Sequence, residues 1–268
     1  DANIPVGKIV ENGGFIFAQF SINNQGTLIN SGTFANLDAL TNSGTLTNNP
    51  IGVLNNAGSV NNSGTLTNNG EMSNFGVGVI DNSGQFTNNG DVTNFATINN
   101  LAGGHFDNDI GLISNGSLIN NYGTFTSGGD ILTNNQFNNF CTLSNTGLFE
   151  NGGTFNNDGT ITNYGEFKTY SLFENKSNSS FENNGIFINT GTVENDGSLV
   201  NNDSIGNAGH YVNSHELSNF GNFEIFSSGT FKNYGIIANN GSMKVIGVMD
   251  NNNTMIQRGI FRNGGVFN

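Results

Sequence analysis

A period of six residues runs through almost the whole chain. Apolar residues recur at this spacing from Leu28 to Phe267, and Asn follows nearly every one of them two positions later. Gly stands four positions after most of them, so the repeat is apolar-x-Asn-x-Gly-x, with Ser or Thr often in the last place. The phrases "NNSGTLTNNG" at residues 61–70 and "DNSGQFTNNG" at residues 81–90 show how closely the units match. Such a short period restricts the fold more than any other feature of the sequence.

Each hexapeptide is predicted to form a short strand followed by a bend. Six residues are too few for a helix–turn unit, and the helical spacing of three and four between apolar residues is absent. Phe, Ile, Val and Leu flanked by Thr favour strands. Asn and Gly suit the bends, because both tolerate left-handed backbone conformations. The chain is therefore expected to be all-β and to form a β-solenoid, or stack of β-arches.

Steps of eight residues interrupt the period and indicate the size of one coil. An enlarged corner is expected to recur on one edge of a solenoid, and a grouping by four hexapeptides places every such step at the same corner, whereas a grouping by three scatters the steps. One coil would then contain roughly 24–26 residues, and the chain about ten coils. Two hexapeptides per coil also fit but leave little interior, and the seven-residue step from Leu118 to Phe125 departs from the pattern. The eight-residue steps join Leu46 to Leu54, Met72 to Ile80, Ile98 to Phe106, Phe173 to Phe181 and Phe223 to Phe231.

The repeated asparagines are predicted to form buried ladders. Residues two apart in a strand point to the same face, so each Asn accompanies the apolar residue inward or lies at the corner. A side-chain amide has two donors and one acceptor oxygen, and can bond to its equivalents in the coils above and below. Such bonds remove the cost of about 1–3 kcal/mol for each buried unpaired polar group. The predicted ladder residues are Asn36, Asn42, Asn48, Asn56, Asn62, Asn68, Asn74, Asn82, Asn88, Asn94, Asn100 and Asn108.

A coil of this size would place residues 56, 82 and 108 on one ladder, and the six-residue period puts Ser114 in the ladder register. Solvated turn asparagines are the alternative, and they are expected for the second Asn of pairs such as Asn49 and Asn69. The domain prediction is one solenoid over residues 23–268. It is preceded by a strand-like N-terminal segment, residues 1–22, that could pair with a neighbouring molecule.

Composition and charge exclude several classes of protein. The formal net charge of −13 argues against nucleic acid and anionic membrane surfaces as partners. The 23 Phe residues supply apolar area that disordered chains lack. No apolar run approaches the roughly 18 residues of a membrane span, so no membrane insertion is expected. The chain opens at Asp1, as a processed secreted protein would, and the lone Cys141 is expected to be a small buried hydrophobe.

Residues suited to catalysis are scattered, and neither enzymatic activity nor a cofactor is expected. No phosphate-binding loop and no Cys/His metal spacing is present. The three histidines, His105, His210 and His215, are far apart in sequence and are expected at the surface. A carbohydrate-active β-helix remains an alternative, but it would need isolated acids to meet by folding. Those acids are Asp107, Asp109, Glu216 and Glu224.

The threonines form a separate pattern, because T-x-T words are similar to the arrays of ice-binding solenoids. They occur at residues 45–47, 65–67, 124–126 and 160–162. An ice-binding face requires such words on one side of the stack. A coil of four hexapeptides distributes them over three sides, which disfavours ice binding.

Asn-x-Ser/Thr sequons occur seven times, and most are expected at the surface, outside the ladder register. Glycans are therefore candidate partners. The candidate glycosylation sites are Asn61, Asn115, Asn202, Asn240 and Asn252, and further sequons begin at Asn175 and Asn178.

The ends of the predicted solenoid show no helical cap, and strand edges left open there are templates for another chain. We therefore expect the protein to be its own partner and to polymerise by end stacking or lateral strand addition. The alternative is the stalk or passenger domain of an adhesin.

The phrase N-x-G-T-[LF]-x-N resembles Asn/Gly-rich repeat proteins of microbial cell surfaces. Over residues 23–268 the pattern is most similar to the major sheath proteins of methanogenic archaea, whose tubes are stacked hoops of β-arch subunits with amyloid-like character. The resemblance implies secretion to the cell surface and self-assembly into a resistant tubular coat. It assigns no functional residues.

Overall fold

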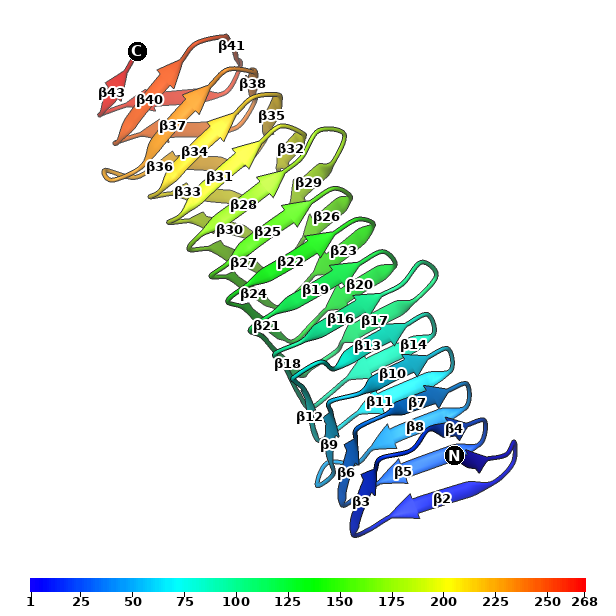
Figure 1. Cartoon of the computed structure of the whole chain (residues 1–268). Helices are drawn as coiled ribbons and strands as arrows, with labels where there is room; N and C mark the ends of the chain where they lie inside the picture. The colour runs from blue at the N-terminus through cyan, green and yellow to red at the C-terminus, as the bar shows by residue number, and fades with distance from the viewer. The chain divides into compact units, whose positions relative to one another are not determined.

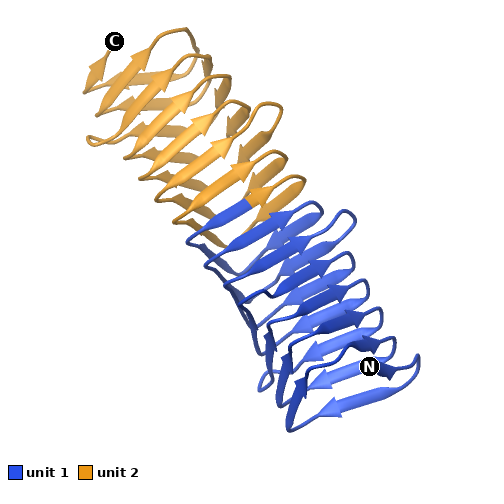
Figure 2. Ribbon diagram, viewed as in Figure 1, with its two compact units in different colours: residues 1–137 blue, residues 138–268 orange.

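The computed structural model of the protein describes residues 1–268 and contains 43 β-strands and no helix (Figure 1). The chain divides into two compact units, unit 1 with residues 1–137 and unit 2 with residues 138–268 (Figure 2). Most strands contain four residues and are separated by two, which matches the predicted hexapeptide. The all-β solenoid prediction is confirmed.

Unit 1 contains strands β1 to β21 and the first half of β22, because the boundary between the units falls within β22. Their bounds are β1 (Ala2–Ile4), β2 (Ile9–Asn12), β3 (Phe15–Ala18), β4 (Ile22–Asn24), β5 (Thr27–Asn30), β6 (Thr33–Asn36), β7 (Ala39–Asn42), β8 (Thr45–Asn48), β9 (Val53–Asn56), β10 (Ser59–Asn62), β11 (Thr65–Asn68), β12 (Glu71–Asn74), β13 (Val79–Asn82), β14 (Gln85–Asn88), β15 (Asp91–Asn94), β16 (Thr97–Asn100), β17 (His105–Asn108), β18 (Leu112–Asn115), β19 (Leu118–Asn121), β20 (Thr124–Ser127), β21 (Asp130–Thr133) and β22 (Gln136–Asn139).

Unit 2 continues with the same strand length and spacing. The bounds are β23 (Thr142–Asn145), β24 (Leu148–Asn151), β25 (Thr154–Asn157), β26 (Thr160–Asn163), β27 (Glu166–Thr169), β28 (Leu172–Asn175), β29 (Ser180–Asn183), β30 (Ile186–Asn189), β31 (Thr192–Asn195), β32 (Ser198–Asn201), β33 (Ser204–Asn207), β34 (His210–Asn213), β35 (Glu216–Asn219), β36 (Asn222–Ile225), β37 (Thr230–Asn233), β38 (Ile236–Asn239), β39 (Ser242–Val245), β40 (Val248–Asn251), β41 (Thr254–Gln257), β42 (Ile260–Asn263) and β43 (Val266–Phe267).

One coil consists of three strands, not four. Within each unit, an inner strand pairs in parallel with the third strand before it and the third after it, so each unit has three parallel sheets around its interior. We call them sheet A (β1, β4, β7 and onward), sheet B (β2, β5, β8 and onward) and sheet C (β3, β6, β9 and onward). Asn30, Asn48 and Asn68 stack in successive coils of sheet B, at separations of 18 and then 20 residues. The predicted coil of four hexapeptides is therefore wrong, and the 43 strands make about 15 turns rather than ten.

The eight-residue steps misled the prediction because each insertion closes on itself. In the insertion after β8, the Gly52 amide donates to the Asn49 carbonyl at 2.8 Å, and after β12 the Gly78 amide donates to the Phe75 carbonyl at 2.9 Å. The chain thus returns to the same corner with its register intact, and the next coil needs no matching insertion. These insertions consequently lie at all three corners of the coil: after β8 on sheet B, β12 on sheet C and β16 on sheet A.

At the ordinary corners glycine is required because neighbouring coils approach too closely for a Cβ atom, and not because the backbone is left-handed there. Positive φ angles occur only at four positions, all inside inserted turns: Gly7 (75°), Gly76 (65°), Gly103 (82°) and Asn178 (70°). At an ordinary corner, a Cβ placed on Gly64 would collide with the carbonyl oxygen of the residue stacked beneath it. The predicted reason for the repeat glycine was therefore wrong.

The interior of each unit contains the apolar member of every hexapeptide, and most of these side chains are at most 1% exposed. In unit 1 the ring centroid of Phe106 lies 4.2 Å from that of Phe86 and 4.7 Å from that of Phe125, along one column of sheet B. The core positions near residue 115 differ from the prediction by one residue. Ile113 and Ile119 are fully buried, rather than Leu112 and Leu118.

Candidate functional site

Buried amide ladders confirm the prediction for the repeated asparagines. Asn62 illustrates the geometry: its Oδ1 accepts from Nδ2 of Asn42 at 2.7 Å, and its Nδ2 donates to Oδ1 of Asn82 at 2.7 Å and to the Gln85 carbonyl at 2.9 Å. The second N–H of each amide therefore bonds to the backbone, which the prediction did not include. At most 1% of the surface is exposed for each of Asn36, Asn42, Asn48, Asn56, Asn62, Asn68, Asn74, Asn82, Asn88, Asn94, Asn100 and Asn108.

Each unit has three ladders, one inside each sheet. Asn56, Asn82 and Asn108 are all buried, but they lie on sheets C, A and B respectively, so they do not stack on one another as predicted. Asn56 bonds instead to Asn36 and Asn74, which are 20 and 18 residues away. The error follows directly from the coil size.

The ladders are directional. In every Asn–Asn ladder bond shown above, Nδ2 of the earlier coil donates to Oδ1 of the later one. Near the N-terminal end, the Oδ1 atoms of Asn24 and Asn36 have no hydrogen-bond partner, since the preceding ladder positions are Ile4 and Ala18. Amide ladders and parallel strands thus give unit 1 a single polarity.

The first coil exposes core side chains that every inner coil covers. Residues 1–22 contribute β1, β2 and β3, which pair with β4, β5 and β6 of the same chain. Val10, in the core column of sheet B, is 37% exposed, whereas Leu28, stacked on it, is 1% exposed. An apolar cavity of about 340 Å³ opens here, and Val10, Ile16 and Leu28 are among its lining residues.

The last coil exposes its core in the same way. In the core columns, Met255 and Phe261 are partly exposed, and Phe267 of β43 is 40% exposed. Ile260 and Val266 add outward-facing apolar surface, with 52% and 51% exposed. Both end faces of residues 1–268 therefore combine open strand edges with apolar side chains.

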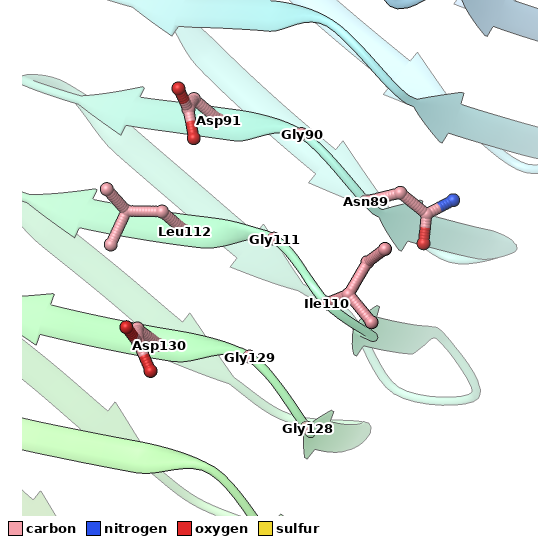
Figure 3. A pocket seen from close by; sticks show the side chains of 9 residues that line it. All are labelled: Asn89, Gly90, Asp91, Ile110, Gly111, Leu112, Gly128, Gly129 and Asp130. Atoms are coloured by element: carbon pink, nitrogen blue, oxygen red, sulfur yellow. The ribbon is translucent and has the colours of Figure 1, made fainter.

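A surface depression of about 370 Å³ lies along one corner of unit 1 (Figure 3). It crosses three coils, with glycines at the bend and Asp91, Leu112 and Asp130 at the starts of β15, β18 and β21. Leu112 separates the two carboxylates in the stack (Figure 3). No group of three or more His, Cys, Asp or Glu side chains in the structure is arranged to hold a metal ion.

The remaining reactive residues are distributed over several strands of both units. His105 and Asp107 are outward residues of β17, while Glu216 is on β35. Glu224 of β36 forms an ion pair with Lys244 at 2.7 Å. Cys141 is exposed, which contradicts the predicted burial, because it occupies the corner position that glycine holds in the repeat.

The surface prediction for Asn115 is wrong. Asn115 is fully buried, accepts from Nδ2 of Asn94 at 2.8 Å and donates to Oγ1 of Thr133 at 3.0 Å, so it belongs to the ladder, and Ser114 does not. Asn61, Asn202 and Asn252 are exposed, and Asn240 is half-buried.

The T-x-T words also lie differently from the prediction. Residues 45–47, 65–67 and 124–126 belong to β8, β11 and β20, which are all in sheet B of unit 1. Residues 160–162 belong to β26, in sheet B of unit 2. The T-x-T words therefore do not fall on three sides of the stack, and that prediction is wrong. The threonine words are visible in the sequence, but the side of the stack on which each one falls depends on the number of strands per coil.

One ionisable group is fully buried. Burial raises the pKa of the Tyr211 phenol far above its usual range, and the hydroxyl has no hydrogen-bond partner. The ring packs against Phe231, with the centroids 5.0 Å apart. Tyr211 therefore acts as an apolar core residue that carries an unpaired hydroxyl.

Comparison with known proteins adds no family. No family model matches the chain, and neither a curated protein nor a solved structure matches it. No helix with the length and hydrophobicity of a membrane span is found in the structure.

Proposed function

We propose that this protein is a structural subunit that self-assembles by stacking its terminal coils head to tail into a cell-surface sheath, tube or fibre. The observation that carries the proposal is the pair of end faces, where core side chains covered in every inner coil are uncovered. A second copy is the occupant that fits best, because it presents strands and side chains with the same three-sided spacing.

The energetic argument follows from the repeat. Side chains of this size contribute about 1.5–3 kcal/mol each when fully buried, and Val10, Ile16, Met255, Phe261 and Phe267 are all uncovered at least in part. The open strand edges supply unpaired N–H and C=O groups for parallel pairing. Head-to-tail stacking preserves the polarity of both the strands and the ladders, whereas head-to-head stacking reverses it. A head-to-tail contact that does not close on itself generates an open filament.

We also propose that the protein lies outside the cell and has a mechanical rather than a catalytic role. The likeness of the repeat to Asn/Gly-rich surface proteins supports a place outside the cell, where a stack of hydrogen-bonded coils would serve as a durable wall element. The ladders engage the amide groups internally, which supports a mechanical rather than a chemical role.

The test is the assembly state of residues 1–268 as a function of concentration, measured by analytical ultracentrifugation and electron microscopy. We expect elongated assemblies that grow with concentration. Val10→Lys places a charge on the first coil and should shift the protein to monomers. The matched control is Ile51→Lys, since Ile51 is 80% exposed in an inserted turn away from both ends. A monomeric protein at every concentration would refute self-assembly and favour a stalk.

A further inference from the structure

One sheet face of unit 1 is unusually rich in threonine. In the four successive strands β5, β8, β11 and β14 of sheet B, six of the eight outward positions are Thr. We call these six residues the threonine face. They are Thr27, Thr45, Thr47, Thr65, Thr67 and Thr87, and the other two outward positions are Ile29 and Gln85.

The threonine face forms two straight columns. Thr27, Thr45 and Thr65 pair directly in successive coils, and so do Thr47, Thr67 and Thr87. Adjacent strands are about 4.8 Å apart, and residues two apart along a strand are separated by about 6.7 Å. The columns therefore define a two-dimensional lattice of methyl and hydroxyl groups. Each of these side chains is half-buried or exposed.

Strand propensity does not explain this concentration. Thr favours strands in general, so propensity alone would enrich it equally on all three sheets of the same coils. Sheets A and C of these coils, β4, β7, β10 and β13 with β6, β9, β12 and β15, have only three outward threonines: Thr33, Thr41 and Thr93. They also carry outward charges, which the threonine face lacks. These are Asp81 on sheet A, and Glu71 and Asp91 on sheet C.

We propose that the threonine face binds the surface of ice crystals. The two spacings of the face, between adjacent strands and between residues two apart along a strand, are comparable to the oxygen–oxygen spacings on the faces of hexagonal ice. A hydroxyl can both donate and accept a hydrogen bond. The threonine methyl groups provide the apolar surface between the hydroxyls. Many weak contacts in lattice register add up to adsorption on an extended crystal, even though no single contact binds strongly.

The chemistry of the face favours ice over other extended surfaces. A crystalline polysaccharide would be expected to use aromatic rings for stacking on sugars, and none of the eight outward positions of β5, β8, β11 and β14 is aromatic. A charged mineral surface would need carboxylates or ammonium groups, and these are also absent from the eight positions. In the next strand, β17, the outward residues His105 and Asp107 end the uncharged array. Unit 2 carries a shorter array on β23 and β26, made of Thr142, Ser144, Thr160 and Thr162.

The experiment measures ice growth in the presence of residues 1–268, by thermal hysteresis in a nanolitre osmometer and by partition of the protein into a slowly growing ice hemisphere. We expect the protein to shape ice crystals and to enter the ice. Thr67→Lys, at the centre of the face, should abolish most of the hysteresis and exclude the protein from the ice. The matched control is Thr93→Lys, because Thr93 is a half-buried outward residue on sheet C of the next coil. The control should behave as the parent does, and circular dichroism should show that both variants fold.

Three results would overturn the inference: no effect of the folded parent on ice, equal loss in both variants, or retention on microcrystalline cellulose without retention on ice. The test is independent of assembly. The Val10→Lys variant should still enter ice as a monomer, so a failure of the proposed self-assembly and a failure of ice binding are distinguishable.

Discussion

Adjacent asparagines on β10 allow a direct measurement of what the ladder contributes. Asn62 is 1% exposed and sits within the sheet A ladder, whereas Asn61 points outward and is exposed. We predict that Asn62→Ala strongly destabilises the protein and that Asn61→Ala does not. Both variants should be made in a host without N-glycosylation, because Asn61 begins a sequon.

The magnitude follows from the groups that lose their partners. Asn62→Ala leaves Oδ1 of Asn82 without its donor and one N–H of Asn42 without its acceptor, while the other N–H of Asn42 keeps the Thr65 carbonyl at 2.9 Å. The Gln85 carbonyl also loses its side-chain donor. The two buried side-chain groups left unpaired, at about 1–3 kcal/mol each, give a loss of about 2–6 kcal/mol. Asn61→Ala should stay within about 0.5 kcal/mol of the parent, as surface substitutions usually do.

The assay is urea unfolding, combined with hydrogen exchange of the backbone amides in β7, β10 and β13, because a repeat array can unfold in segments. Faster exchange should be centred on these three strands in Asn62→Ala. A loss for Asn62→Ala no larger than that for Asn61→Ala would refute the view that the ladder amides stabilise the stack.

Three further predictions concern the corner, the buried tyrosine and the interrupted ladder. Gly64→Ala should destabilise by about 1–3 kcal/mol in urea unfolding, since the new Cβ meets the carbonyl of the coil beneath; an unchanged midpoint would contradict the close approach. Tyr211→Phe should stabilise by about 1–3 kcal/mol by removing an unpaired hydroxyl. Because burial raises the pKa of Tyr211, the native state retains this proton, so the parent should lose stability as the pH rises above about 10, where the unfolded state releases it. Between pH 8 and pH 11 the free energy of unfolding should fall less for Tyr211→Phe than for the parent. Equal falls in the two proteins would contradict this prediction. Ile225→Asn should destabilise the protein, because Val245, the next ladder position, offers no acceptor for the new side-chain amide. Adding Val245→Asn should recover part of that loss, as a double-mutant cycle would measure. Additive losses would argue against a restored ladder.

The hexapeptide period was sufficient to predict the strands, the inward side chains and the amide ladders. Strand alternation places an apolar residue and the residue two positions later on one face, whatever the shape of the coil. The number of strands per coil could not be predicted in the same way. It depended on the inserted turns, and a turn closed by its own hydrogen bond, such as Gly52 to Asn49, does not require an equivalent in the next coil.

The one-residue error at Asn115 has a local cause. Leu112 and Ile113 are both apolar, and so are Leu118 and Ile119, so the period can be followed through either member of each pair. The asparagine decides between them, because Asn115 follows Ile113 by the two residues that the ladder requires. The repeat is therefore identified better by its amide than by its apolar residue, since many apolar side chains fill a core position but few polar ones fit a ladder.

The natural interruption of one ladder shows how the interior constrains the sequence. In sheet C of unit 2, Asn207 donates to the Thr230 carbonyl, and the next two ladder positions are Ile225 and Val245, both fully buried. Replacing both partners of a buried hydrogen bond with apolar groups can be nearly neutral, whereas removing one partner is costly. The constraint thus acts between neighbouring coils of the same sheet, and each ladder can change without the other two. Outward positions are not subject to the ladder constraint, because their side chains point away from the interior. A threonine pattern that is maintained outward on one sheet and missing from the other two is therefore not required by the core or by the ladder, and this is why the threonine face supports the proposal of binding.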